Sequence, residues 1–177
     1  MAAHVNLIQL REKNLSTRVL YDLTLQAARI TRGSNTHLLI NDRADVARSA
    51  GAAGVHLTAG SLDASVIRRT FGDDFLIGVS THSLEQARAA RDAGADFEVF
   101  GPVFDTASKR VYGEPIGLQK LEEVTTTLTQ FPVLALGGVT LDNAADCFRA
   151  GAAGVAAIRL MHDPDDLARV VAEIRAL

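Results

Sequence analysis

The sequence predicts a parallel α/β barrel of the TIM type, and three observations support this fold class. Short apolar runs alternate along the 177 residues with longer segments in which apolar residues recur at helical spacing. Hydrophobic residues make up 47% of the chain and aromatic residues only 5%, a composition typical of closely packed parallel sheets. The hexapeptide Ala50–Val55 also recurs unchanged as Ala150–Val155, with a weaker copy at Ala93–Phe97. Repeated strand–helix units of this kind predict parallel strands joined by right-handed crossovers.

The chain contains seven expected strands, each followed by an expected helix. The strands are almost continuously apolar, as strands covered on both faces should be, and comprise Val5–Leu10, His37–Ile40, Gly54–Leu57, Leu76–Ser80, Phe97–Phe100, Val133–Leu136 and Gly154–Ile158. The helices comprise Ser16–Arg32, Ala44–Ala50, Asp63–Thr70, Leu84–Ala93, Gln119–Leu128, Leu141–Ala150 and Pro164–Ala176. A closed TIM barrel has one strand–helix unit more than this. We therefore expect residues 1–177 to form a single domain that lacks one unit.

Local signals mark several of the expected helix ends. In each copy of the repeat, a glycine suited to the left-handed position after a helix is followed at once by a buried strand. Ser83 is expected to cap a helix, with Gln86 as its capping-box partner. Asp163 precedes Pro164, which suits the first position of the last helix.

Charge, cysteine content and hydropathy narrow the functional classes. Net charge is −3, and no block of Lys and Arg suggests a nucleic-acid-binding face. No apolar run approaches the roughly 20 residues of a membrane helix, and the amino terminus lacks the pattern of a signal peptide. The single cysteine, Cys147, lies in an apolar-periodic segment and is expected to be buried. These features predict a cytoplasmic protein that binds neither nucleic acid nor membrane.

Polar residues follow the first expected strand, and the active sites of parallel barrels lie at the carboxyl ends of their strands. Gln9, Arg11 and Lys13 alternate with other residues, so they are expected on one side of the chain. Two cations and an amide suit a phosphate or diphosphate. Ion pairing with Glu12 on a solvated rim explains the same residues equally well.

Polar residues also follow the second and fourth strands. Asn41 and Asp42 offer oxygen ligands of the kind Mg²⁺ prefers, although Asp42 equally suits a cap for the helix at Ala44. Ser80 offers a hydroxyl and His82 an imidazole. A histidine in such a loop is more often a polar loop residue than a catalytic base.

The longest irregular stretch, Gly101–Gly117, follows the fifth strand, and loops of this length in compact domains are usually functional. It contains Thr106, Ser108 and Lys109, a polar and cationic group suited to a phosphate. An ordinary surface loop is the alternative.

The last two strands also end in residues suited to an anion. Gly137 and Gly138 follow the sixth strand, where free backbone N–H groups at a helix start can bind an anion. The seventh strand runs into Ile158 and Arg159, and Arg159 adds charge at the edge where such barrels commonly bind phosphate.

Six segments of the chain form an ordered set of motifs. They are Gln9–Lys13 (QLREK), Leu39–Arg43 (LINDR), Gly54–Leu57 (GVHL), Gly78–His82 (GVSTH), Phe100–Lys109 (FGPVFDTASK) and Leu136–Val139 (LGGV). Together they resemble the thiamine phosphate synthase and TenI family over nearly the whole chain, and thiamine phosphate synthase more closely. The resemblance implies a transferase that joins a hydroxymethylpyrimidine diphosphate to a thiazole phosphate and releases pyrophosphate with the help of Mg²⁺.

The same resemblance assigns roles at the diphosphate end of the reaction. It implies that Gln9 and Asn41 contact the pyrimidine diphosphate, while Arg11, Lys13 and Lys109 neutralise its phosphates. Electrostatic stabilisation of the leaving diphosphate is then the main catalytic effect.

The remaining implied roles concern the metal, the leaving group and the thiazole phosphate. Asp42 is implied as a Mg²⁺ ligand, and Ser80 as a catalytic residue near the departing diphosphate. The thiazole phosphate is expected to be held by Thr106, Ser108, Gly138, Ile158 and Arg159.

Several positions depart from the family pattern. Ser61 stands where the family carries a second metal-binding Asp, which weakens the expected Mg²⁺ site, and Asp63 is a candidate substitute. Glu98 and Val99 replace an apolar residue and a glycine, and a carboxylate inside a strand is costly unless it is paired. Arg159 replaces a small residue, so it either strengthens anion binding or fills the site.

The missing unit is the first strand and helix of the family pattern. Three explanations stay open: a misassigned internal start of the chain, a partner that closes the gap, or a rearranged fold. An open edge of this kind exposes strand backbone and core, so we expect a partner to cover it, most simply in a homodimer.

Two alternative functions stay open from the sequence. A TenI-like thiazole tautomerase needs no Mg²⁺ and so tolerates Ser61, but the resemblance calls for a histidine where this chain has Pro102. The other alternative is a catalytically impaired barrel that only binds phosphorylated thiamine precursors.

Overall fold

The computed structural model describes residues 4–106 and 114–177 as a parallel α/β fold. The strands follow one another in the sheet in chain order: β1 (Leu7–Leu10), β2 (His37–Asn41), β3 (Gly54–Leu57), β4 (Leu76–Thr81), β5 (Phe97–Phe100), β6 (Val133–Leu136) and β7 (Gly154–Ala156). The helices are α1 (Thr17–Thr31), α2 (Ala44–Ala50), α3 (Ala64–Phe71), α4 (Leu84–Asp92), α5 (Leu118–Thr127), α6 (Leu141–Arg149) and α7 (Leu167–Arg175), with a short 3₁₀ helix η2 (Arg159–Met161) before α7. The expected parallel α/β fold is therefore confirmed.

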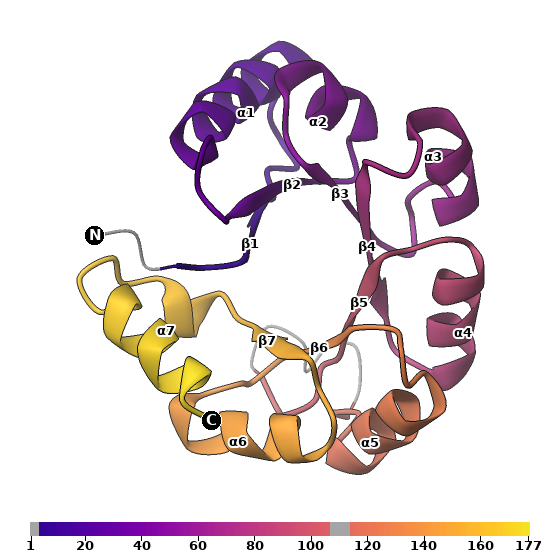
Figure 1. Cartoon of the computed structure of the whole chain (residues 1–177), viewed down its shortest axis with the longest axis vertical. Helices are drawn as coiled ribbons and strands as arrows, with labels where there is room; N and C mark the ends of the chain where they lie inside the picture. The colour runs from indigo at the N-terminus through magenta and orange to yellow at the C-terminus, as the bar shows by residue number, and fades with distance from the viewer. Residues whose placement is uncertain (1–3, 107–113) are drawn as a thin grey trace. The chain divides into compact units, whose positions relative to one another are not determined.

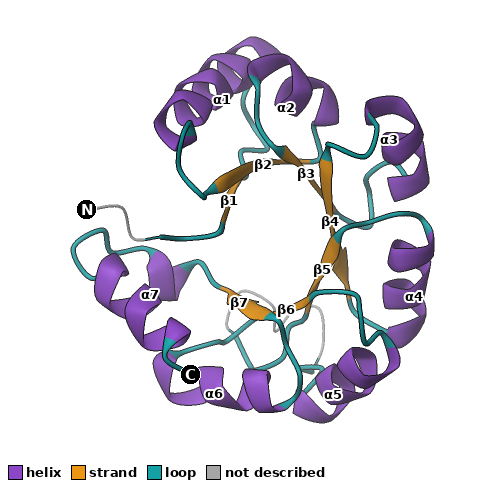
Figure 2. Cartoon of the chain, in the orientation of Figure 1, coloured by secondary structure: helices purple, strands orange, loops and turns teal. Residues whose placement is uncertain are grey.

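The chain divides into two compact units. Figure 1 labels the strands and helices that each of them contains. The amino-terminal unit comprises residues 4–79 and 93–95, and the carboxy-terminal unit comprises the described residues of 80–92 and 96–177. The last residues of β4 therefore belong to the carboxy-terminal unit. In each unit the helices lie along one face of the strands (Figure 2). This arrangement explains why the strand residues that face the helices are apolar.

The amino-terminal unit is built around aliphatic side chains from both layers. Its strands pair in parallel register, with Leu39 opposite Gly54 and Gly54 opposite Leu76. Ile40, Val55 and Ile77 are fully buried in the core. The α1 helix begins at the expected place, because the Ser16 hydroxyl accepts a hydrogen bond from the Val19 N–H.

The carboxy-terminal unit has its own buried residues on strands and helices. Phe100 on β5, Val133 on β6, Leu121 on α5 and Cys147 on α6 are all almost completely inaccessible. The expected burial of Cys147 is confirmed, and that burial raises the pKa of its thiol to about 11. The thiol is therefore an apolar packing group at neutral pH.

The repeat plays the structural role that the sequence predicts. Gly51, Gly94 and Gly151 have φ angles of 77°, 86° and 84°, in the left-handed region that favours glycine. The two copies of the hexapeptide both lead from a helix end into a strand, at β3 and at β7.

Predictions for the last strand and helix need correction. β7 ends at Ala156, so Ile158 and Arg159 lie beyond the strand, and Arg159 begins η2. The last helix begins at Leu167 instead of Pro164, because the Asp163 carboxylate accepts a hydrogen bond from the Asp165 N–H in a turn. The Asp163–Pro164 pair thus starts a turn, although the same residue types are also common where a helix starts.

Candidate active site

The carboxyl ends of β1 and β2 bring two of the predicted residues into direct contact. The Gln9 side-chain amide donates a hydrogen bond of 3.0 Å to the Asn41 side-chain oxygen, across 32 residues of sequence. The two strands pair in parallel with Gln9 opposite Leu39 and Leu10 opposite Ile40, so their ends lie at the same edge. Arg11 and Lys13 follow on the exposed side of this edge.

His56 on β3 lies next to this cluster and was given no role from the sequence. It sits opposite Asn41 in the strand register and is 5% exposed. Burial, and to a smaller extent the nearby positive charge of Arg11, lowers the pKa of His56 to about 4. The ring is therefore neutral at physiological pH and can hold a polar contact without adding charge to the cationic edge.

Asp42 does not cap the helix at Ala44, which settles one of the open alternatives. The N-cap residue of α2 is Arg43, and Arg43 pairs with Asp45 at 2.6 Å and bonds the Thr17 hydroxyl at 3.1 Å. Asp42 itself has a φ of 64°, uncommon for a residue with a side chain. Its backbone N–H is fixed by the His56 carbonyl at 2.9 Å. Unusual backbone geometry at a strand end is a common feature of functional positions.

Two further candidate metal ligands, Ser61 and Asp63, already make hydrogen bonds within the protein. The Ser61 hydroxyl accepts a hydrogen bond of 2.8 Å from the Thr58 N–H and so closes a turn. The Asp63 carboxylate caps α3, accepting from the Ser65 N–H at 2.8 Å and its hydroxyl at 2.5 Å. These bonds lower the pKa of Asp63 and hold it at the helix start. The idea that Asp63 replaces the missing carboxylate therefore gains no support.

Asp42 is thus the carboxylate best suited to a metal in this unit. Within the described residues, no group of three or more His, Cys, Asp or Glu side chains is placed to hold an ion. Mg²⁺ is commonly bound by one or two carboxylates together with substrate phosphate oxygens. The donor set fits Mg²⁺ only in that shared form.

In the carboxy-terminal unit, the ends of β4 and β5 are tied together. The Gly101 N–H donates to the Thr81 carbonyl at 3.3 Å, and the His82 ring nitrogen Nδ1 bonds the Gly101 carbonyl. The Thr81 hydroxyl donates a hydrogen bond of 2.5 Å to Glu98. Thr81 is therefore the partner that this carboxyl group was expected to need. Ser80 precedes Thr81 and is half-buried at the end of β4.

The paired glycines after β6 are packed against the segment that follows β5. A β-carbon added at Gly138 would lie 2.6 Å from the Asp105 carbonyl oxygen, and one at Gly137 would lie 2.5 Å from Pro102. The Phe104 N–H donates to the Gly137 carbonyl at 3.0 Å. The glycines therefore permit close contact between two backbone segments, in addition to any role in binding an anion.

The predicted thiazole-phosphate residues are only partly described. Thr106 follows Asp105, whose carbonyl contacts Gly138, so these two predicted positions lie close together. Ile158 is 77% exposed and Arg159 is exposed at the start of η2, after β7. Since β6 and β7 pair in parallel, Gly138, Ile158 and Arg159 follow strand ends at one edge. Ser108 and Lys109 lie outside the described residues.

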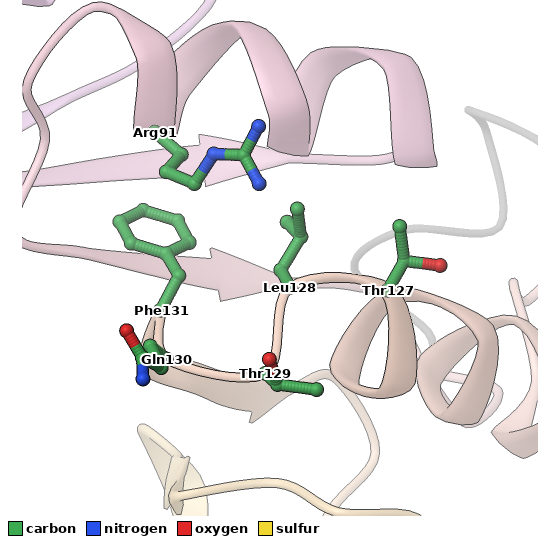
Figure 3. Close-up of a pocket in the computed structure, with 6 residues that line it drawn as sticks. All are labelled: Arg91, Thr127, Leu128, Thr129, Gln130 and Phe131. Carbon is green, nitrogen blue, oxygen red and sulfur yellow. The ribbon is translucent and has the colours of Figure 1, made fainter.

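A surface hollow in the same unit lies elsewhere (Figure 3). It is lined by Arg91 on α4, by Thr127 at the end of α5 and by the residues 128–131 that lead to β6. This segment precedes the amino end of β6, so it lies at the edge opposite to Gly137 and Gly138. The hollow is therefore separate from the candidate site.

Comparisons with known proteins place the chain in a family. A family model described as thiamine monophosphate synthase matches residues 1–161. The chain belongs to this family. A relative from Geobacter sulfurreducens is 46% identical over 178 residues, which cover 100% of this chain and 83% of that one. The thiamine-phosphate synthase of Clostridium novyi is 39% identical over 161 residues, covering 91% of this chain and 78% of that one.

A solved structure supports the same assignment. Thiamine phosphate pyrophosphorylase from Pyrococcus furiosus matches with a TM-score of 0.85 at 32% identity, covering 97% of this chain and 81% of that chain. The resemblance noted in the sequence is confirmed, and membership of the thiamine monophosphate synthase family identifies the chain as an enzyme of the transferase class. Among the described residues, no helix is long and apolar enough to span a membrane.

Proposed function

We propose that this chain joins hydroxymethylpyrimidine diphosphate to thiazole phosphate, forming thiamine phosphate and releasing pyrophosphate. The observation that carries the proposal is the Gln9–Asn41 hydrogen bond. It joins the QLREK and LINDR motifs at one edge of the amino-terminal unit, with Arg11 and Asp42 close by in sequence. An amide pair, a cation and a carboxylate at one strand edge suit a heteroaromatic diphosphate.

Each residue at this edge has a proposed task. Gln9 and Asn41 hold each other in fixed orientations, so that their remaining amide groups can bind the pyrimidine. Arg11 and Lys13 neutralise the diphosphate, which stabilises the negative charge that develops as pyrophosphate leaves. His56 is neutral beside Arg11, so it adds no further positive charge to this edge.

In the carboxy-terminal unit we propose binding of the thiazole phosphate. The backbone around Gly138, together with Thr106, Ile158 and Arg159, supplies donors at strand ends, and Ser108 belongs to the same proposed set. Lys109 is proposed to help neutralise the pyrimidine diphosphate. Ser80 is proposed to contact the departing diphosphate. Backbone N–H groups and a nearby cation are a common combination for phosphate.

Asp42 is proposed to hold Mg²⁺ jointly with the substrate diphosphate, where the ion would neutralise the leaving group. Ser61 and Asp63 are engaged in a turn and a helix cap, so they are not assigned to the metal. This donor set predicts weak metal binding by the free protein and much tighter binding once diphosphate is present.

The test is a transfer assay with both substrates, in Mg²⁺ and in excess chelator, with thiamine phosphate and pyrophosphate measured separately. Metal-dependent formation of both products supports the proposal. Ser61→Asp serves as a matched variant, because a second carboxylate should lower the Mg²⁺ concentration needed for half-maximal rate by about tenfold. Metal-independent isomerisation of the thiazole would favour the tautomerase, and binding without product would favour the catalytically impaired barrel.

We also propose that a second copy of the chain covers one face of the amino-terminal unit. Val19, Leu23 and Ile30 lie on one stripe of α1 and are 49%, 36% and 83% exposed. Among the described residues, β1 pairs only with β2, and Ile8 on β1 is 43% exposed. Apolar helix stripes and open strand edges of this kind are commonly buried by association.

Sedimentation velocity tests this homodimer. Leu23→Glu should weaken association at least about tenfold, because it places a charge in the proposed contact. Leu62→Glu is the control, since Leu62 is 65% exposed and lies outside α1. A native chain that stays monomeric at high concentration would contradict the proposal.

A further inference from the structure

Glu98 is a carboxyl group buried completely inside the carboxy-terminal unit. It lies on β5 with 0% of its surface exposed, between Phe97 and Val99, which are also buried. One of its oxygens, Oε2, accepts the 2.5 Å hydrogen bond from the Thr81 hydroxyl. The other, Oε1, has no hydrogen-bond partner among the described residues. A buried polar atom without a partner is uncommon and calls for a physical explanation.

The protonation state of Glu98 provides that explanation. An ionised carboxylate in this place would need more donors than one hydroxyl, and its burial would cost several kcal/mol. A neutral carboxylic acid carries no charge. With Oε2 accepting from Thr81, its proton lies on Oε1, and one unpaired O–H costs far less than a buried charge. Burial accordingly raises the pKa of Glu98 to about 7, although the Thr81 hydrogen bond lowers it in part.

The charged groups around Glu98 do not provide an alternative partner. The helix packed on β5 is α4, and its titratable residues Glu85, Arg88, Arg91 and Asp92 are all exposed. The other nearby titratable groups are Asp96, just before β5, and His82, after β4. Neither these two nor the four residues of α4 shift the pKa of Glu98. β6 contributes only the apolar residues Val133–Leu136.

Thr81 transmits the state of Glu98 to the ends of two strands. Its hydroxyl donates to Glu98, while its carbonyl accepts from the Gly101 N–H, at the point where β5 ends. Its neighbours in sequence are Ser80, proposed to contact the leaving diphosphate, and His82, whose ring bonds the Gly101 carbonyl. Thr81 therefore lies between Glu98 and Ser80, and it contacts the end of β5, from which the segment towards Thr106 begins.

We propose that Glu98 is a positioning residue that acts as a neutral acid, holding the carboxyl ends of β4 and β5 together through Thr81, and that its ionisation loosens these ends. Its effect on catalysis rests on the proposed transferase function, whereas its effect on the strand ends does not. Ionisation places a charge in a dry interior, and the structure relieves this cost by admitting water or separating Thr81 from β5.

Hydrogen exchange of the Gly101 amide tests the structural part, independently of activity. Glu98→Gln is the matched variant, because it keeps the shape and the acceptor but cannot ionise. From about pH 6 to about pH 8, the protection factor of this amide should fall about tenfold more in the native chain than in Glu98→Gln. Equal changes in the two proteins would overturn the proposal.

The kinetic part compares the rate at about pH 8 with the rate at about pH 6 in the same two proteins. The ratio should be about tenfold lower in the native chain than in Glu98→Gln, mainly through kcat. Thr81→Ser should keep the native ratio, and Thr81→Val should lower protection of Gly101 at both pH values. If neither protein transfers, the proposed function fails and the exchange result still decides the role of Glu98.

Discussion

Polar side chains within the mostly apolar strands are accommodated in different ways, as three of them show. Asn41 bonds Gln9, His56 is kept neutral by burial and by Arg11, and Glu98 is bonded by Thr81. The sequence indicated that Glu98 needed a partner, but the partner stands 17 residues earlier on another strand. Residue patterns set which face a side chain occupies and leave open which neighbour it meets.

His56 shows what sequence reasoning missed at this scale. It belongs to the GVHL motif, yet the motif alone predicts no role for it. The available signal was a titratable residue in a four-residue strand otherwise made of Gly, Val and Leu. Such a residue is costly to bury unless it stays neutral or gains a partner, and this argument alone marks it for attention. The placement of Ser108 and Lys109 stays a prediction.

The two carboxylates near the proposed metal site have separable roles. Asp42→Asn should weaken Mg²⁺-dependent binding of pyrophosphate at least about tenfold, because it removes the proposed ligand. Asp63→Asn should leave that binding unchanged and lower the free energy of unfolding by at most about 1 kcal/mol, since it alters only the α3 cap. Calorimetry with pyrophosphate and urea denaturation measure the two effects. A loss of metal binding in Asp63→Asn would contradict this assignment.

At the scale of the elements, apolar runs and glycine positions were sufficient to place most strands and helices. The two runs that failed were the seventh strand and the start of the last helix. Asp163 instead accepts a hydrogen bond in a turn, and Arg159 lies in η2, although each residue is compatible with the expected element. Strand pairing and helix caps decide such boundaries, and the local sequence contains only part of that information.

The repeated hexapeptide offers a matched pair of substitutions at this scale. Gly51→Ala should lower the free energy of unfolding by about 1 kcal/mol, the cost of a left-handed conformation, because nothing lies within 4 Å of the added carbon. Gly151→Ala should cost about twice as much or more, because the new carbon would lie 2.6 Å from the Thr125 hydroxyl oxygen. That hydroxyl is held in place by the Ala150 carbonyl. Equal losses in urea denaturation would show that Thr125 moves freely.

For the whole molecule, the sequence predicted a parallel α/β fold of the correct family and the order of its units. It could not state how the edge beyond β1 is covered, because that depends on surfaces and partners instead of local pattern. Expectations of a single domain and of a TIM-type barrel that lacks its first strand–helix unit stay predictions. The pH dependence of stability is also a property of the whole chain. The buried groups His56 and Glu98 make the free energy of unfolding change with pH in opposite directions.

The two groups make stability depend on pH in opposing directions. The pKa of His56 falls from 6.5 to about 4, so its contribution to stability is lost as pH drops from 6.5 towards 4. The pKa of Glu98 rises from 4.5 to about 7, so its contribution is present at low pH and is lost as pH rises towards 7. Each shift corresponds to about 3 kcal/mol, and the two largely offset each other in the native chain.

Single substitutions should reveal each slope. In Glu98→Gln, the free energy of unfolding should rise by about 3 kcal/mol from about pH 4 to about pH 6.5, because only the His56 effect is left. In His56→Gln, it should fall by a similar amount from about pH 4.5 to about pH 7. Asp45, Asp63 and Asp166 have lowered pKa values and act mainly below this window. Urea denaturation at a series of pH values measures both slopes, and parallel profiles in all three proteins would show that neither group is buried in its stated charge state.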